Sequence, residues 1–192
     1  MREMFAKKLW INLLCEFGPI ASFLIVYQFS TFGKATIAMV IATCISFVIL
    51  LKIEKHVPYF ALLNTVSVIL FGGVSALIDI PDIFIIRDTI FDLVLGIVLL
   101  TTVNFKRTGL QMLFSNVFLI TQKGWKIFTF RWGIFYLILA LTNEVIRNYA
   151  NEQMWVEAKV WMILATVIFG MYQLTLTKRE RLPEANSYGL QK

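Results

Sequence analysis

Residues 35–51 read ATIAMVIATCISFVILL, a run without a charged side chain. A helix that crosses the hydrocarbon core of a bilayer needs ~20 mainly apolar residues, with a range of about 17–25. This run therefore predicts a membrane-spanning helix.

Five further apolar stretches compete for the same interpretation. They cover residues 10–27, 59–78, 88–105, 127–146 and 155–176. The stretch 10–27 contains Glu16 and Pro19, which are costly in lipid unless protein covers them, so it either crosses or re-enters. The sequence thus predicts an all-α, polytopic helical membrane protein with five or six transmembrane helices.

The composition agrees with this fold class. The chain has 192 residues, of which 58% are hydrophobic and 16% charged, with a net charge of +6. An ordinary soluble domain is about 45–50% apolar and about 25% charged. A soluble enzyme domain and a disordered chain are therefore excluded. In a membrane protein the basic surplus records orientation rather than nucleic-acid binding.

The connection 106–126 is the only long one between these stretches. Leu110, Leu113, Phe114 and Val117 recur there at helical spacing between basic ends. This pattern predicts one interfacial helix over residues 108–120, because the segment is too short to cross. We expect residues 1–177 to form a single helical membrane domain and residues 178–192 to form a polar, unstructured cytoplasmic tail.

The basic residues predict the orientation. One side receives Arg2, Lys7, Lys8, Lys52, Lys55, Lys106, Arg107, Lys123, Lys126, Lys178, Arg179, Arg181 and Lys192. The other side receives only Lys34, Arg87, Arg147 and Lys159. Positive residues stay cytoplasmic, so the C-terminus and the connection 106–126 are expected inside the cell.

Ionisable groups in spanning segments are candidate functional residues because they are expensive there. Glu144, beside Asn143, lies near the end of the fifth stretch, where the helix dipole disfavours a negative charge. Arg147 is three residues on, and Lys159 enters the next stretch from the same side. We expect this polar cluster to be either a structural ion pair joining two helix ends or a ligand or lipid-headgroup site.

Other notable residues have simpler interpretations. Asp88 and Asp92 are expected to cap and solvate the start of the fourth stretch. Gly72 and Gly73 predict close helix packing or a local break in the third stretch. Three tryptophans, Trp125, Trp132 and Trp155, lie near predicted boundaries, as expected of an aromatic belt. Beside Trp132, Arg131 can extend to the headgroups.

The sequence carries no motif for catalysis or metal binding. It has no phosphate-binding loop, no HExxH, no cysteine pair with metal spacing, and a single histidine, His56. Cys15 and Cys44 lie in apolar stretches and are interpreted as small apolar fillers. We therefore predict a protein that is not an enzyme, with no cofactor and no metal.

The order of several motifs resembles one family. These motifs are WKIFTFRWGIFY from Trp125, which includes Arg131 and Trp132, then Asn143-Glu144-Val145, then Trp155-Val156 with Lys159. Upstream, Phe17-Gly18-Pro19 and Leu70-Phe71-Gly72-Gly73 fit the same pattern. Together they resemble the intracellular septation protein A family, also called YciB or inner membrane-spanning protein. Ala158 departs from the family's phenylalanine at that position.

This resemblance implies a multi-pass protein of the bacterial inner membrane. It implies a non-enzymatic role in cell division (septation), cell-envelope biogenesis and membrane integrity. The expected partners are the lipid bilayer and other division or envelope-synthesis membrane proteins, and no nucleic acid. The alternative is a small-molecule or lipid transporter with a polar site near Glu144 and Lys159.

Overall fold

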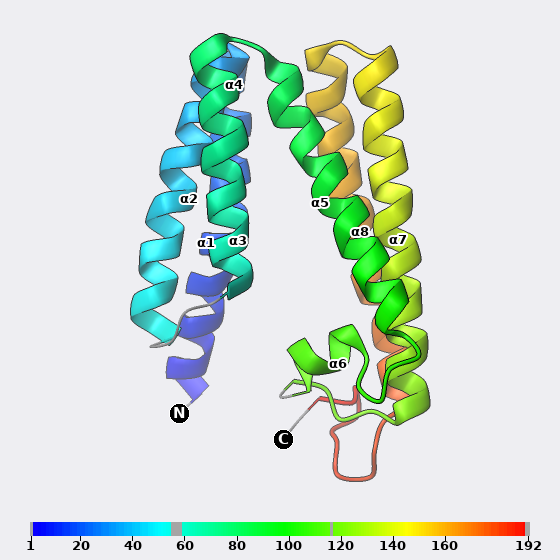
Figure 1. The fold of residues 1–192 in the computed structure, drawn as a ribbon. Coiled ribbons are helices and arrows are strands. Elements are labelled where there is room, and N and C mark those ends of the chain that lie inside the picture. The colour runs from blue at the N-terminus through cyan, green and yellow to red at the C-terminus, as the bar shows by residue number, and fades with distance from the viewer. Residues whose placement is uncertain (1, 55–58, 116, 191–192) are drawn as a thin grey trace. The chain divides into compact units, whose positions relative to one another are not determined.

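The computed structural model describes residues 2–54, 59–115 and 117–190, and the side chains of residues 2–10, 12, 13, 16, 54, 59 and 60 lie outside that description. His56 and the Glu16 carboxyl group therefore lie outside the described part. The described chain is almost entirely helical (Figure 1). The helices are α1 (Arg2–Phe29), α2 (Phe32–Glu54), α3 (Tyr59–Ser67), α4 (Gly73–Ile78), α5 (Pro81–Thr102), α6 (Gly109–Phe114), α7 (Gln122–Tyr149) and α8 (Glu152–Arg179), with a π-helical segment η1 (Val68–Gly72) between α3 and α4.

Four described segments are long and apolar enough to cross a membrane. They are Phe32–Ile53, Ala61–Ile78, Gln122–Tyr149 and Glu152–Arg179, and Phe17–Phe29 is a shorter apolar segment. Large hydrophobic side chains such as Ile41, Leu141 and Ile168 lie on their exposed surfaces, as lipid contact requires. The chain is thus an all-α membrane protein, as the apolar stretches predicted.

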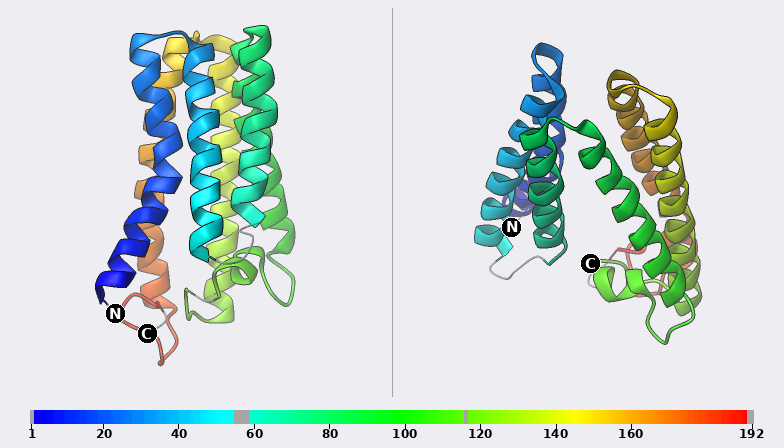
Figure 2. Two further views of the ribbon diagram at one scale, coloured as in Figure 1. Left: turned by 90° about the vertical axis from the view of Figure 1, so that its left-hand side faces the viewer. Right: turned by 45° about the horizontal axis from the view of Figure 1, so that its top comes forward.

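The chain divides into two compact units, Met1–Arg87 and Asp88–Lys192, and the boundary falls within α5. In unit 1, α1 and α2 pack along each other (Figures 1 and 2). Phe23, Phe32 and Phe84 form its aromatic core, with ring centroids 5.3–6.1 Å apart. Helix α1 is unbroken despite Pro19, so its backbone makes no re-entrant turn.

The third apolar stretch, residues 59–78, shows both features expected at Gly72 and Gly73, which are a local break in the α-helix and close packing against another helix. The π-helical segment ends at Gly72, and a Cβ atom there would lie 3.1 Å from Val40 Cγ2 of α2. Gly73 has no atom within 4 Å of the position of a Cβ. Close approach to α2 therefore involves Gly72, while Gly73 lies in open space.

In unit 2, α7 and α8 run side by side in opposite directions (Figures 1 and 2). The Thr121 hydroxyl accepts from Gly124 N, and the Asn151 side chain accepts from Met154 N, so both helices start at capped residues. Gly96 of α5 and Gly133 of α7 meet closely, because a Cβ on Gly96 would lie 3.0 Å from Gly133 O. The caps define where α7 and α8 start, and the close approach of Gly96 to Gly133 places α5 against α7.

The end of unit 2 that carries α6 differs in two ways from the prediction. Of the described residues 108–115 and 117–120, only Gly109–Phe114 are helical, and Thr108 and Gln111 form a capping box at the start of this helix. The expected interfacial helix over residues 108–120 is therefore shorter than predicted. The tail is not unstructured, because Leu119 N donates to Gly189 O and Leu182 N donates to Leu119 O. Backbone pairing with the tail replaces helix over residues 118–120.

Candidate functional site

A polar network joins α5, α7 and α8 in unit 2, and Asn143 is at its centre. The Asn143 side chain is fully buried. Its Oδ1 accepts a hydrogen bond from Trp155 Nε1 of α8 at 2.9 Å, and its Nδ2 donates to Thr89 Oγ1 of α5 at 2.8 Å. One amide therefore links three helices with both of its polar atoms bonded.

An ion pair lies beside this amide. Lys159 Nζ of α8 lies 2.5 Å from Asp88 Oδ2 of α5. The Asp88 side chain is 7% exposed and that of Lys159 23% exposed. Lys159 also lies 5.9 Å from the centroid of the Trp155 ring, so the indole faces both Asn143 and the cation.

Glu144 has partners of its own on α7. Arg147 binds its carboxylate through two hydrogen bonds, of 3.0 Å from Nε and 2.5 Å from Nη2. Asn148 Nδ2 donates to Glu144 Oε1 at 2.9 Å, and Thr89 Oγ1 donates to Oε2 at 3.3 Å. The Glu144 side chain is 35% exposed, which makes this the outer part of the network.

The structure brings together all four residues of the predicted cluster and divides the charged ones between two ion pairs. Arg147 is the partner of Glu144, whereas Lys159 pairs with Asp88. The interpretation of Asp88 as a capping, solvated residue is wrong, because α5 begins at Pro81 and Asp88 lies about two turns inside it, buried. Thr89 and Trp155 complete a network that the sequence interpretation left incomplete.

Two of the motif tryptophans do not form an outward belt. Trp125 and Trp155 are each only 3% exposed, and Trp125 packs against Phe128. Trp132 packs edge-on against Phe169 of α8, with ring centroids 5.0 Å apart. The motif thus supplies much of the contact between α7 and α8.

Two motif residues remain, Val156 and Arg131. Val156 is buried beside Trp155, and the Arg131 guanidinium lies 5.5 Å from the centroid of the Tyr172 ring of α8. Arg131 therefore interacts with the neighbouring helix. Its extension to headgroups stays a prediction.

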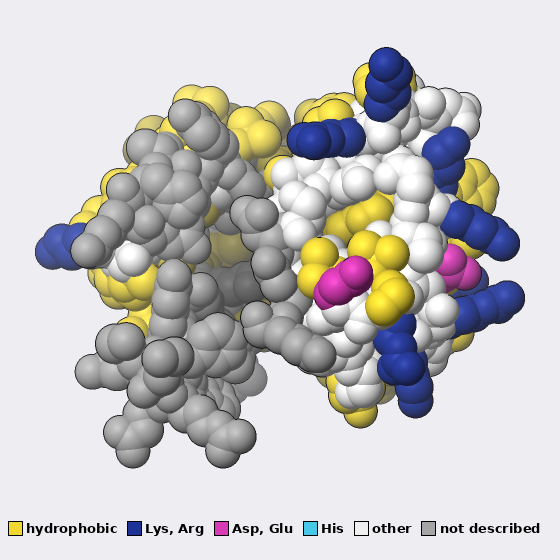
Figure 3. All heavy atoms as spheres, turned by 90° about the horizontal axis from the view of Figure 1, so that it is seen from below, with side chains coloured by type: hydrophobic (Ala, Val, Ile, Leu, Met, Phe, Trp, Pro, Cys, Tyr) yellow, Lys and Arg dark blue, Asp and Glu magenta, His cyan; other side chains and the backbone are white. Residues whose placement is uncertain are grey.

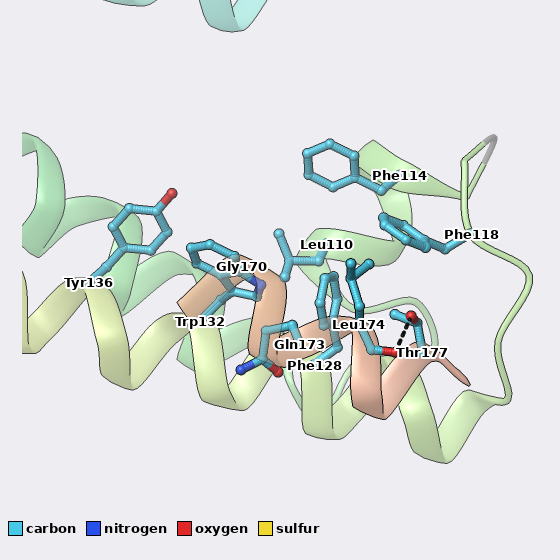
Figure 4. A pocket seen from close by; sticks show the side chains of 10 residues that line it. All are labelled: Leu110, Phe114, Phe118, Phe128, Trp132, Tyr136, Gly170, Gln173, Leu174 and Thr177. Atoms are coloured by element: carbon cyan, nitrogen blue, oxygen red, sulfur yellow. Dashed lines mark hydrogen bonds between the residues drawn. The ribbon is translucent and has the colours of Figure 1, made fainter. Parts of the chain in front are cut away.

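A cavity of about 310 Å³ lies at the other end of unit 2, between α6, α7 and α8 (Figure 4). Aromatic rings of Phe114, Phe128 and Trp132 line it together with Gly170 and Gln173. The Gln173 side chain is 2% exposed, and neither its Nε2 nor its Oε1 has a hydrogen-bond partner. The sequence interpretation missed Gln173, although a single amide in the apolar run of α8 was the available signal.

Basic side chains surround the same end of the unit. The exposed residues are Lys106, Arg107, Lys123, Lys126, Lys178, Arg179 and Arg181. Seen from below, Lys and Arg side chains lie around this end of unit 2 (Figure 3). Among the described residues, no group of three His, Cys, Asp or Glu side chains could hold a metal ion.

Comparisons with known proteins agree on one family. The model of the family "Intracellular septation protein A" matches residues 11–184. The chain is 32% identical over 181 residues to the inner membrane-spanning protein YciB of Afipia carboxidovorans, covering 92% of this chain and 88% of that protein. Its identity to the protein of the same name from Nitrobacter hamburgensis is 30% over 175 residues, covering 91% and 88%.

A third relative extends this likeness. The inner membrane-spanning protein YciB of Mesorhizobium japonicum is 32% identical over 195 residues, with coverage of 92% and 86%. No solved structure matches the chain. The family match therefore spans residues of both units.

Proposed function

The chain belongs to the intracellular septation protein A family, and we propose that in the bacterial inner membrane it supports septation, envelope biogenesis and membrane integrity without catalysing a reaction. It acts through contacts with other envelope-building membrane proteins. The family match over residues 11–184 is the observation that carries this proposal. The relatives' names state only that they span the inner membrane.

The polar network supports a structural role for its residues over a transport site. Asn143 uses its donor and its acceptor within the protein, and Lys159 and Glu144 each have an opposite charge as partner. A substrate would have to displace these bonds in a medium where an unpaired group is costly. The cavity of about 310 Å³ is lined by none of these residues.

The orientation is part of the proposal. The connection 106–126 and the tail lie at the same end of unit 2, where backbone hydrogen bonds join them. That end carries the exposed basic side chains, which favours a cytoplasmic position. Fusions of alkaline phosphatase or green fluorescent protein after Lys126 and at the C-terminus test this, and phosphatase activity at either site contradicts it.

Complementation tests the function. In a strain that lacks its own family member and shows a division defect, the wild-type chain restores normal cell length. Photocrosslinking in native membranes from the exposed residues Ile41 and Leu141 then identifies neighbours, and we expect division or envelope-synthesis proteins. Restored division without such neighbours contradicts action through contacts, and failure to restore division contradicts the septation role.

A further inference from the structure

The C-terminal tail folds back on the connection that leads into α7. Residues 180–190 of the tail form a strap with two arms joined by a turn. The N–H group of Leu119 in the connection donates to Gly189 O at 2.7 Å, and the C=O group of Leu119 accepts from Leu182 N at 2.9 Å. Both backbone groups of one connecting residue are therefore bonded to the strap, one to each arm.

The two arms of the strap are held unequally. The near arm continues directly from α8, and Thr121 donates twice to Glu180, from N to the backbone oxygen at 2.8 Å and from Oγ1 to Oε2 at 2.7 Å. The far arm, residues 188–190, is held by the bond from the connection and by Thr177 Oγ1, which donates to Tyr188 O at 2.8 Å. Each of these two bonds reaches a different element, so the far arm joins the connection to α8.

Gly189 gives the far arm a conformation that favours glycine. Its φ is +76°, in the left-handed region, and a Cβ atom there would lie 2.6 Å from Thr177 O. The turn before it is closed by bonds of its own, because Asn186 Oδ1 accepts from Tyr188 N at 2.8 Å and from Leu190 N at 2.9 Å. The far arm can therefore leave α8 while its turn stays folded.

The far arm contacts the cavity through two of the residues that line it. Phe118 pairs with Leu190 in an antiparallel bridge, and Thr177 donates to the far arm. Both residues line the cavity of about 310 Å³ between α6, α7 and α8 (Figure 4). Leu110 and Phe114 of α6 also line it, just before the connection. The far arm thus helps to hold one wall of the cavity in place.

We propose that the strap gates this cavity. In the closed state, which the structure shows, the far arm holds Phe118 and Thr177 in the lining. In the open state the far arm is released at Gly189, and the wall that carries Phe114 and Phe118 moves away from α7 and α8. The near arm stays bonded to Thr121, and α7 stays packed on α8 through aromatic contacts. Such local opening occurs where few bonds and little buried apolar surface hold a segment.

Hydrogen exchange at single amides of the full chain in nanodiscs, followed by NMR, measures the opening. Gly189→Ala strains the left-handed backbone and meets Thr177 O, so it favours the open state. We expect exchange at Leu119 to become at least about tenfold faster, and exchange at Thr121, which the near arm holds, to stay nearly unchanged. Ser187→Ala, an exposed change in the same strap, is the matched control and should alter neither amide.

Thiol labelling follows the cavity wall itself. The two native cysteines are replaced by alanine, and Leu110→Cys places a thiol in the buried part of the lining. We expect Gly189→Ala to speed its reaction with N-ethylmaleimide by the same factor as exchange at Leu119, because one opening exposes both. Leu139→Cys, at a buried position of α7 outside the lining, is the control and should react at an unchanged rate.

A disulfide tests the closed state without relying on the folding of Gly189→Ala. Because Leu119 N bonds to Gly189 O, Phe118 and Leu190 form a closely spaced pair without mutual hydrogen bonds, and two cysteines can join there. In the chain without native cysteines, Phe118→Cys with Leu190→Cys should oxidise readily. Oxidation should slow exchange at Leu119, and dithiothreitol should restore the faster rate.

Three results overturn the proposal. Exchange at Leu119 as slow as that at Leu139 in the wild type would mean that the connection is released only when the unit unfolds. Exchange at Leu119 that neither Gly189→Ala nor oxidation changes would mean that the far arm does not hold the connection. Labelling at Leu110→Cys that does not follow exchange at Leu119, or that rises equally at Leu139→Cys, would mean that the strap does not move the cavity wall.

Discussion

The described part of unit 2 buries one side-chain amide near each end of the unit, and the two amides have opposite surroundings. Asn143 is bonded through both of its polar atoms, to Trp155 and Thr89. Gln173 is buried to nearly the same extent, yet neither of its polar atoms has a protein partner. The first amide is fully bonded within the fold, whereas the second is enclosed without a hydrogen-bond partner.

This difference follows from what surrounds each amide. Asn143 faces two helices that each supply one complementary group, so three elements are held in one register. The Gln173 amide is enclosed among side chains that offer it neither an acceptor nor a donor within hydrogen-bond distance. Buried amides in similar apolar stretches thus differ in whether their neighbours complete their hydrogen bonds.

The largest expected effect comes from breaking the ion pair at the bonded end. Asp88→Ala leaves Lys159 without its partner in a mostly buried position and should lower the free energy of unfolding by about 3 kcal/mol. Unfolding in a detergent titration measures this change. Glu157→Ala, which removes an exposed acid two residues from Lys159, is the control and should change it by less than about 0.5 kcal/mol.

A double variant tests the pairing itself. Adding Lys159→Met to Asp88→Ala removes the uncompensated charge, so the two changes together should cost less than the sum of the single changes. Additive free energies would contradict the pair between α5 and α8. The sequence named Lys159 as a member of the cluster but did not predict Asp88 as its partner.

The bonded amide gives the next largest effect. Asn143→Leu removes two hydrogen bonds and leaves the indole Nε1–H of Trp155 without its acceptor. We expect a loss of about 1–3 kcal/mol, since bonds between helices in membranes contribute about 0.6–1.7 kcal/mol each. Thermal unfolding in detergent checks it, and an unchanged stability would mean that the amide does not join the helices.

The exposed part of the network should respond least. Glu144→Ala breaks a pair within one helix whose acid is 35% exposed, so the loss should be about 0–1 kcal/mol. The same unfolding assay with Arg147→Ala as companion tests this. A loss as large as that of Asp88→Ala would show that Glu144 belongs to the buried part of the network.

Much of the fold could be predicted because apolar length and helix content are local properties. The stretch 59–78 was predicted with the bounds that the structure shows for α3, η1 and α4 together. The start of α5 was placed seven residues late, because Asp82 and Arg87 interrupt the apolar pattern, although Pro81 is a favoured first helical residue.

The site was predictable only in part, because the contacts that build it join residues far apart in the sequence. The cost of charge in a membrane singled out Glu144 and Lys159, but the cost says nothing about which helix supplies the partner. Asp88 meets Lys159 across 71 positions of sequence, and residues 118–120 pair with the tail in the same non-local way. Gln173 was missed because an amide carries no charge to mark it.

The contrast between the two amides can be tested in one experiment. The free energies of unfolding of the wild type, Asn143→Leu and Gln173→Leu are measured in the same lipid-free detergent. The account predicts opposite signs: Asn143→Leu lowers stability, and Gln173→Leu raises it by about 1 kcal/mol, because an unpaired buried amide is replaced by an apolar group of similar size. A loss of stability in both variants would contradict it, since Gln173 would then be bonded within the protein.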